Sequence, residues 1–313
     1  MQRSDLPRSL GAAFSVGAAF DVGVSPSRLR ADDLCTPFHG VRTLKTDPTP
    51  ETAEAMLLER ARQYLHRMSE NEFFSHVTAA VIWNLPLPYG VVAGRPLDVA
   101  VTWPRRAPES QGINAHAIRP ELAHARMHAD TGLAVCTPAT TWALLGGVLT
   151  RVEDLVAVGD AIVRVPMHEN DAPPLGTIAQ LRAAMDAGRR TGIDRLRAAL
   201  PLISDRSRSR PETWLRLILL DAGLPAPAVN YDVVEGGQWL GQVDLAYPHL
   251  RIAIEYEGEY HLTDPAQWDA DIARMDRLVE AGWRVIRVTK KGVFLHPMRT
   301  VERVRLAVAA ASR

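Results

Sequence analysis

Residues 252–261 read IAIEYEGEYH, and they place three carboxylates and one histidine in a stretch that otherwise has the composition of a buried strand. The preceding stretch, residues 240–250, reads LGQVDLAYPHL, in which Pro248 and His249 are typical of a turn between two strands. The two stretches therefore predict a β-hairpin. Its acidic residues decide how the C-terminal part of the chain is interpreted.

Side chains alternate between the two faces of a strand, so Glu255 and Glu257 share one face of the second strand. Asp244 on the first strand is predicted to point to that same face. One interpretation is an amphipathic hairpin whose polar face meets water. The other is a metal site, because neighbouring carboxylates repel each other unless a cation offsets the repulsion. Oxygen ligands favour Mg²⁺ or Mn²⁺, and His261 keeps zinc open as an alternative.

The segments on either side of the hairpin predict helices. Residues 209–223, SRPETWLRLILLDAG, have a capping Ser209 at the start and a glycine at the end. Glu212 lies in the first turn, where it either complements the helix dipole or joins the hairpin acids. A second helix is expected from Pro265, followed by a strand over WRVIRVT (283–289). With a strand before the hairpin, the predicted order is αβββαβ.

Residues 209–313 resemble the small endonuclease domains related to very short patch repair endonuclease, within the PD-(D/E)XK nuclease superfamily. The resemblance rests on the hairpin acids, on the Gly and His that follow them, and on three charged residues of the next helix. These residues are Asp244, Glu255, Glu257, Gly258, His261, Asp269, Arg274 and Asp276. The resemblance implies a restriction-endonuclease-like fold that hydrolyses DNA with Mg²⁺ or Mn²⁺.

The resemblance also implies roles for individual residues. The metal ligands would be Glu212, Asp244 and Glu255, and the catalytic residues would be Asp244, Glu255, Glu257 and His261. The general superfamily pattern has a lysine two residues after the hairpin acid, and this chain has Glu257 there. Positive charge at the site would then come from His261, Lys290 or Lys291, of which the two lysines are also candidate nucleic-acid contacts.

The N-terminal stretch FSVGAAFDVGVSPSRLRADDL (14–34) predicts two short helices with a tight junction. Ser15 caps the first helix, and Gly23 ends it. This is a helix-turn-helix pattern, in which Arg28 and Arg30 on the second helix are candidate DNA contacts. The alternative is a small packing module that touches no DNA.

The region after this module predicts mainly helices with one strand between them. The helices are expected over 51–68, 73–88 and 133–164, and the strand over 95–104. The polar residues His76, Thr78 and Thr140 are interpreted as helix caps or satisfied core groups.

Residues 9 to about 165 resemble actinobacterial proteins related to AbiEi-type antitoxins. The motifs that carry the resemblance are SHVTAAVIWNLPLP, TPATTWALL and DLVAVGDAIV. It implies a winged-helix-like start and an association with DNA. The predicted domains are a winged-helix-like, mostly helical region over 1–165, a helical connector over 166–204 and an endonuclease-like domain over 205–313, which makes the fold class α/β (α+β).

Composition sets the remaining expectations. The 313 residues contain 36 Lys and Arg and 36 Asp and Glu, so DNA binding would need a local basic surface. Two isolated cysteines and the lack of a long apolar run predict a cytoplasmic protein without a membrane span. The function expected is a metal-dependent DNA endonuclease, with a homodimer needed to cut both strands. The alternative is a DNA-binding regulator or antitoxin with an inactive nuclease-like domain.

Overall fold

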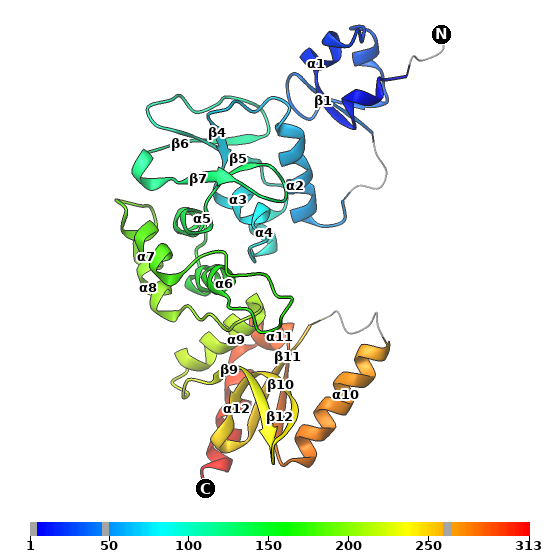
Figure 1. The fold of residues 1–313 in the computed structure, drawn as a ribbon. Helices are drawn as coiled ribbons and strands as arrows, with labels where there is room; N and C mark the ends of the chain where they lie inside the picture. The colour runs from blue at the N-terminus through cyan, green and yellow to red at the C-terminus, as the bar shows by residue number, and fades with distance from the viewer. Residues whose placement is uncertain (1–4, 46–49, 259–264) are drawn as a thin grey trace. The chain divides into compact units, whose positions relative to one another are not determined.

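A computed structural model describes residues 5–45, 50–258 and 265–313, with side chains described from residue 271 onward in the last range. His261 lies outside the described residues. The fold is mixed α/β, as expected, and it divides into two compact units (Figure 1). Unit 1 comprises residues 1–150 and 178–197, and unit 2 comprises residues 151–177 and 198–313.

Unit 1 begins with a small module in which a three-stranded antiparallel sheet carries one short helix. The elements are β1 (Ala13–Ser15), α1 (Val16–Asp21), η2 (Arg28–Arg30), β2 (Leu34–Cys35) and β3 (Val41–Leu44), in sheet order β1-β3-β2. Ser15 caps α1 as predicted, since its Oγ accepts a hydrogen bond from the Ala18 amide at 3.0 Å.

The prediction of a second helix in the helix-turn-helix pattern is wrong. A single 3₁₀ turn, η2, stands in its place, because the backbone becomes extended at Ala31 and continues into β2. Three residues make less than one turn of α-helix, so the structure has no recognition helix in this described stretch.

The rest of unit 1 is built on a five-stranded mixed sheet in the order β6-β5-β4-β8-β7. The strands are β4 (Glu72–Phe74), β5 (Leu97–Thr102), β6 (Ile113–Ile118), β7 (Ala125–Met127) and β8 (Ala134–Cys136). The main helices around it are α2 (Ala53–Tyr64), α3 (His76–Ile82), α5 (Pro138–Leu145) and α7 (Ile178–Asp186). The expectation of a mostly helical region is therefore wrong. The sequence of β6, INAHAI, hides the strand because its side chains are mostly half-buried or exposed and show no clear alternation.

Unit 2 has the predicted element order. Its four-stranded sheet runs β12-β11-β10-β9, with β10 antiparallel to β9 and β11, and β11 parallel to β12. The elements are α9 (Arg210–Asp221), β9 (Ala228–Glu235), β10 (Gln238–Tyr247), β11 (Ile252–Glu257), α10 (Pro265–Glu280), β12 (Arg284–Thr289), α11 (Lys290–Phe294) and α12 (Pro297–Ala311).

Helices cover both faces of this sheet (Figure 1). Leu245 and Ile254 face a cluster formed with α9 and α12, whereas Ala246 and Ala253 belong to a second cluster that includes Leu278 of α10. The predicted alternation is therefore confirmed for residues 245–247 and 252–254, but it breaks at Val243, which belongs to the second cluster. The acids of the hairpin therefore lie on the α10 side of the sheet.

Helix α6 (Val152–Val163) packs on α9 through buried polar contacts. Arg216 pairs with Asp160 at 3.0 Å, and Asp154 accepts hydrogen bonds from Trp214 Nε1 at 2.9 Å and from Arg210 Nε at 2.8 Å. Helix α6 thus belongs to unit 2, whereas the predicted domain boundary at residue 165 lies after it.

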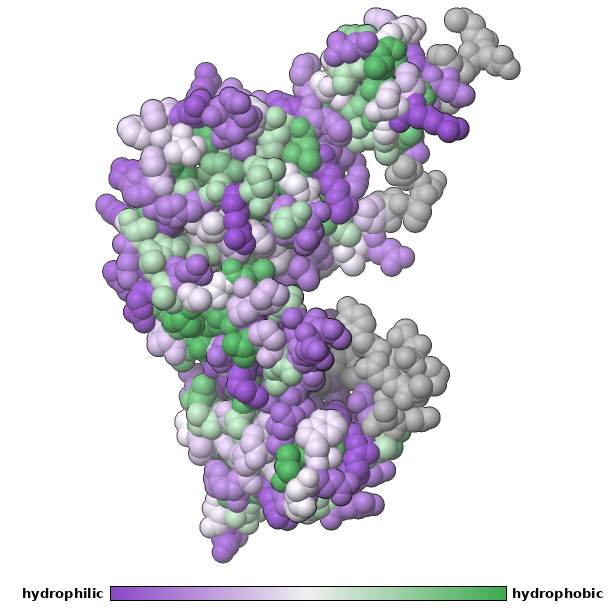
Figure 2. Space-filling model, in the orientation of Figure 1, coloured by the Kyte–Doolittle hydropathy of each residue, from purple (hydrophilic) through white to green (hydrophobic). Residues whose placement is uncertain are grey.

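In the described ranges, no helix is both long and apolar enough to cross a membrane. Hydrophilic residues are distributed over the visible face of each unit (Figure 2).

Candidate functional site

The hairpin acids lie at one end of the ladder between β10 and β11. Leu245 pairs with Ile254 in this antiparallel ladder, so the next pair outward is Asp244 opposite Glu255. Asp244 Oδ2 also accepts a hydrogen bond of 2.7 Å from the Tyr256 amide. The predicted convergence of these two carboxylates is present in the structure.

A cleft of about 350 Å³ opens over these acids on the side of α10. The residues that line it come from the hairpin, from α10 and from β12. They are Asp244, Glu255, Tyr256, Glu257, Asp271, Ile272, Arg274, Met275, Asp276 and Arg287. Three of the four predicted catalytic residues therefore share one cleft, and the fourth, His261, lies outside the described residues.

Burial makes ionisation of the two central acids unfavourable. Burial raises the pKa of Asp244 well above its ordinary value, and the charges of Glu255 and Glu212 raise it further. Burial also raises the pKa of Glu255, although the Arg274 guanidinium partly opposes this rise. The site thus combines desolvated carboxylates with mutual repulsion, which a bound cation would relieve.

Arg274 of α10 is the cation nearest to this pair in the described structure. Its Nη1 donates to Glu255 Oε1 at 2.7 Å and also to the carbonyl oxygen of Gln242. Its Nη2 lies 3.6 Å from Asp271, one turn earlier on the helix. Arg274 is part of the family resemblance, but no role at the site is predicted for it from the sequence.

Glu257 lies at the rim of the cleft and forms an ion pair with Arg287 of β12. The parallel ladder between β11 and β12 pairs Arg287 with Glu255, which brings the guanidinium to the acidic face of the sheet. Arg287 therefore supplies positive charge beside Glu257. The pairing of Glu257 with Arg287 could be predicted from the sequence only if the register between β11 and β12 were known.

Glu212 is held at the start of α9. Its backbone amide donates to the capping Ser209 Oγ at 3.3 Å, and its Oε2 accepts from the Arg208 amide at 2.9 Å and from Asn230 Nδ2 at 3.0 Å. It is buried and lies close enough to raise the pKa of both hairpin acids. The structure therefore connects Glu212 to the site electrostatically.

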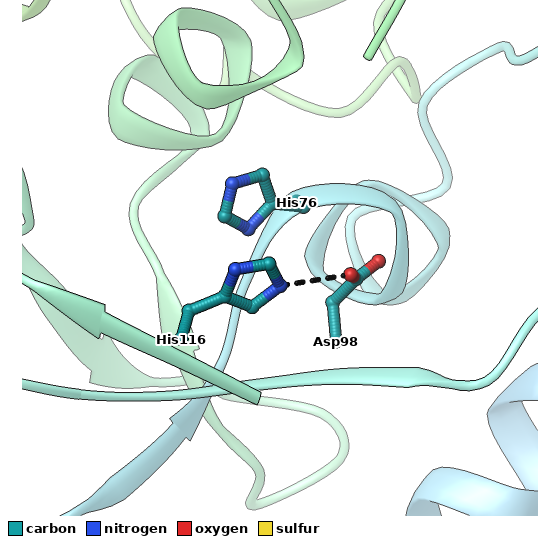
Figure 3. A group of neighbouring side chains, drawn as sticks. All are labelled: His76, Asp98 and His116. Carbon is teal, nitrogen blue, oxygen red and sulfur yellow. Dashed lines mark hydrogen bonds and ion pairs between the residues drawn. The ribbon is translucent and has the colours of Figure 1, made fainter. Parts of the chain in front are cut away.

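The three predicted metal ligands are not packed as one tight group. In the part of the chain that the structure describes, ligand atoms of three His, Cys, Asp or Glu residues lie within 4.8 Å of one another at His76, Asp98 and His116 in unit 1 (Figure 3). This second cluster is not predicted from the sequence. Its members are spread over 41 residues, and their common location depends on the pairing of β5 with β6.

The predicted nucleic-acid contacts are not gathered at either site. Both terminal nitrogens of Arg28 pair with the Asp33 carboxylate, at 2.9 and 2.8 Å, and the side chain is only 9% exposed. Arg30 is exposed. Lys290 and Lys291 are exposed at the start of α11 and are not among the residues that line the acidic cleft.

Comparison with known proteins gives two relatives in Mycobacterium tuberculosis, the uncharacterized proteins MT2308 of strain CDC 1551 and Rv2248 of strain H37Rv. Each is 30% identical to this chain over 181 residues, which cover 58% of this chain and 64% of the relative. The chain thus spans less than two thirds of the length of these relatives. No family model matches the chain, and no solved structure gives a significant match.

Proposed function

We propose that unit 2 is a divalent-metal-dependent endonuclease that hydrolyses phosphodiester bonds in DNA. The observation that carries the proposal is the pair formed by Asp244 and Glu255, which face each other across two strands in a cleft on the sheet. The resemblance of residues 209–313 to very short patch repair endonuclease also supports the proposal.

The donor set of the cleft fits Mg²⁺ or Mn²⁺. Hard divalent cations bind through one or two carboxylates and keep several waters, so they do not require a third protein ligand in tight contact. Asp244 and Glu255 supply these carboxylates, and Glu212 adds negative potential nearby. When bound, the cation would polarise the scissile phosphate and make an attacking water more acidic.

The protein's own side chains divide the remaining tasks. Asp244 is oriented by the Tyr256 amide, and Glu255 is held by Arg274. Arg287 lies at the rim, where a guanidinium can bind a phosphate oxygen of the substrate in competition with Glu257. The proposal thus gives Arg287 the role of positioning the DNA backbone next to the acids.

The test combines metal-binding calorimetry with a plasmid-nicking assay on Asp244→Asn. Asparagine keeps an acceptor for the Tyr256 amide and removes the charge. We expect affinity for Mn²⁺ to fall by at least about tenfold and nicking to disappear, as EDTA would make it disappear in the wild type. Asp232→Asn is a matched control, because Asp232 is an exposed acid of β9 that does not line the cleft. Nicking by Asp244→Asn at the wild-type rate would contradict the proposal.

One observation favours a second candidate function, a DNA-binding regulator whose nuclease-like unit does not cleave. The Arg274 guanidinium lies 2.7 Å from Glu255 and is only 22% exposed, so it places a permanent positive charge beside the acids. Such a charge can substitute for a metal ion and leave a surface that binds DNA without hydrolysing it.

Arg274→Gln separates the two candidates. If Arg274 replaces the metal, the wild type binds no Mn²⁺ and the variant gains binding. If Arg274 only orients Glu255, the wild type binds Mn²⁺ and the variant binds it with changed affinity. DNA binding by the wild type in EDTA, without nicking in Mg²⁺ or Mn²⁺, would support the regulator.

A further inference from the structure

Asp98 of β5 is the centre of the cluster in unit 1. Its side chain is fully buried and accepts hydrogen bonds from four residues. The donors are the Val77 amide at 3.2 Å, Arg95 Nε at 3.1 Å, Asn114 Nδ2 at 2.7 Å and His116 Nε2 at 3.0 Å. Burial alone would raise the pKa of Asp98, but the hydrogen bonds from His116 and Arg95 outweigh it and lower the pKa. Asp98 is therefore an ionised carboxylate whose acceptor sites are occupied by protein donors.

Two histidine rings are stacked beside this carboxylate (Figure 3). His76 and His116 have ring centroids 4.0 Å apart and an angle of 26° between their planes. The backbone of His76 has φ of 44°, a left-handed conformation that is strained for histidine and is often retained at functional sites. The fold thus accepts a local cost to hold His76 against His116.

The geometry of this cluster argues against a metal ion. The lone pairs of an imidazole lie in the plane of its ring, so two stacked rings direct them nearly parallel rather than toward one point. Asp98, the third group, is already saturated with donors. Arg95 lies in contact with Asp98 and would repel a cation.

The surroundings of the histidines are basic. A recess of about 370 Å³ is lined by both histidines, Asn114 and three arginines, and no Asp or Glu lines it among the described residues. The arginines are Arg95, Arg189 and Arg190. An adjoining recess of about 550 Å³ shares the histidines and Arg189 and continues over small and apolar residues of β6, with Arg119 and Glu121 also in its lining.

Arg190 gives the strongest indication that the recess binds an anion. It is 8% exposed, and its guanidinium donates to two backbone carbonyls, those of Ala184 at 2.7 Å and Leu122 at 2.9 Å. These carbonyl oxygens accept from two of its five N–H groups, and among the described residues no acidic side chain forms an ion pair with it, so its buried charge is costly. Burial accordingly lowers the pKa of Arg190. An anion in the recess would offset this cost.

We propose that the recess binds the phosphate group of a nucleotide-sized phosphomonoester, with Arg95, Arg189 and Arg190 supplying the positive charge. Guanidinium groups pair with phosphate oxygens through charge-assisted hydrogen bonds. The combined size of the two recesses suits a small ligand, and the apolar strand face of the second recess suits a nucleoside. The phosphate can belong to a free nucleotide or to the 5′ end of a DNA strand. This site lies in unit 1 and does not depend on the function proposed for unit 2.

The test is titration calorimetry on the full chain in EDTA, with AMP, inorganic phosphate and a short oligonucleotide with or without a 5′-phosphate. We expect one phosphate-dependent site per chain. Arg189→Ala should weaken binding by about tenfold, which corresponds to the loss of one charge-assisted contact. Arg190→Gln should weaken it at least as much. Arg189 is exposed, so its variant tests the site even if Arg190→Gln fails to fold.

Two controls and one competing titration complete the design. Arg182→Ala removes an exposed arginine of α7 outside the recess, and Asp244→Asn changes only the cleft of unit 2, so both should bind AMP like the wild type. Binding of AMP but not of the 5′-phosphorylated strand identifies a free nucleotide as the ligand, and the reverse identifies a strand end. Absence of all phosphate binding would overturn the proposal. It would also be overturned if Zn²⁺ bound the wild type but not His116→Ala, while phosphate binding were insensitive to Arg189→Ala.

Discussion

At the scale of single residues, Asp244 and Asp98 show how the same side chain takes opposite roles. Both are buried. Asp98 is surrounded by donors that keep it ionised, whereas Asp244 faces other carboxylates that favour its protonated form. The first arrangement stabilises the fold, and the second is a stability cost of the kind that functional sites retain.

Because the charge of Asp244 destabilises the folded state, removing it should increase the free energy of unfolding, by an amount that depends on pH. Below about pH 3.9, the ordinary pKa of aspartate, the folded and unfolded states both hold the proton, so Asp244→Asn and the wild type differ little. As the pH rises, the unfolded state loses its proton first, because the folded pKa is raised, and the wild type loses stability. We expect Asp244→Asn to be more stable by about 1 kcal/mol at pH 7.5, measured by urea unfolding without divalent metal. A less stable variant at that pH would contradict the repulsion argument.

Removing the Asp98 carboxylate should have the opposite effect and lower the free energy of unfolding. Asp98→Ala leaves four donors without their acceptor, so the free energy of unfolding should fall by about 3 to 5 kcal/mol. Asp98→Asn keeps one acceptor oxygen and should cost less. As a control, Asp186→Ala removes an exposed acid of α7 and should change stability by under about 0.5 kcal/mol. Equal stability of the two alanine variants in urea unfolding would disprove the structural role.

At the scale of elements, the contact between α6 and α9 is held by polar groups as well as apolar ones. Asp160 accepts from Arg216 at 3.0 Å, from Thr213 Oγ1 at 2.8 Å and from the Ser204 amide at 2.7 Å. Burial raises the pKa of Asp160, and the Arg216 charge opposes the rise. The pair of Asp160 and Arg216 therefore stabilises the fold, because either charge would destabilise the folded state if it were buried alone.

Arg216→Met should lower the free energy of unfolding by about 3 to 5 kcal/mol, because it leaves Asp160 buried without a counter-charge. The double variant Arg216→Met with Asp160→Asn should regain part of this loss, since the stranded charge is gone. Arg305→Met is the matched control: Arg305 pairs with Glu302 on the exposed face of α12, and such pairs contribute at most about 1 kcal/mol. Chemical denaturation of all four proteins gives the comparison. A single variant as stable as the control would contradict the argument.

At the scale of the whole molecule, the chain crosses three times between two units. Residues 151–177 join unit 2 before residues 178–197 return to unit 1, so the boundary in sequence is not a single point. The expected endonuclease-like domain, 205–313, consequently lacks α6. That helix supplies the partners of Trp214 Nε1 and Arg216.

A fragment comparison tests this division. Residues 151–313 contain all of unit 2, and we expect them to fold cooperatively. Residues 205–313 should unfold at a temperature lower by more than about 10 °C, because they expose one face of α9 and leave buried polar groups unpaired. Thermal unfolding followed by circular dichroism measures both. Equal melting temperatures would show that α6 is dispensable for unit 2.

Short-range signals in the sequence determined much of unit 2. The cap at Ser209, the turn at Pro248 and the alternation along the hairpin act over a few residues, and they were sufficient to predict α9, the paired strands and the meeting of Asp244 with Glu255. The same signals failed for η2, where the chain turned into a strand, and for β6, whose side chains show no clear period.

Only the tertiary structure decided which charges meet across distant segments. Arg274 reaches Glu255 because α10 packs on one face of the sheet, and Arg287 reaches Glu257 because β12 pairs with β11 in a particular register. Likewise, the stacking of His76 on His116 depends on strand pairing within unit 1. The sequence alone could determine which residue types are available to each site, because local patterns such as caps, turns and strand alternation depend only on neighbouring residues. It could not determine their partners, because long-range packing and register set the distances between them.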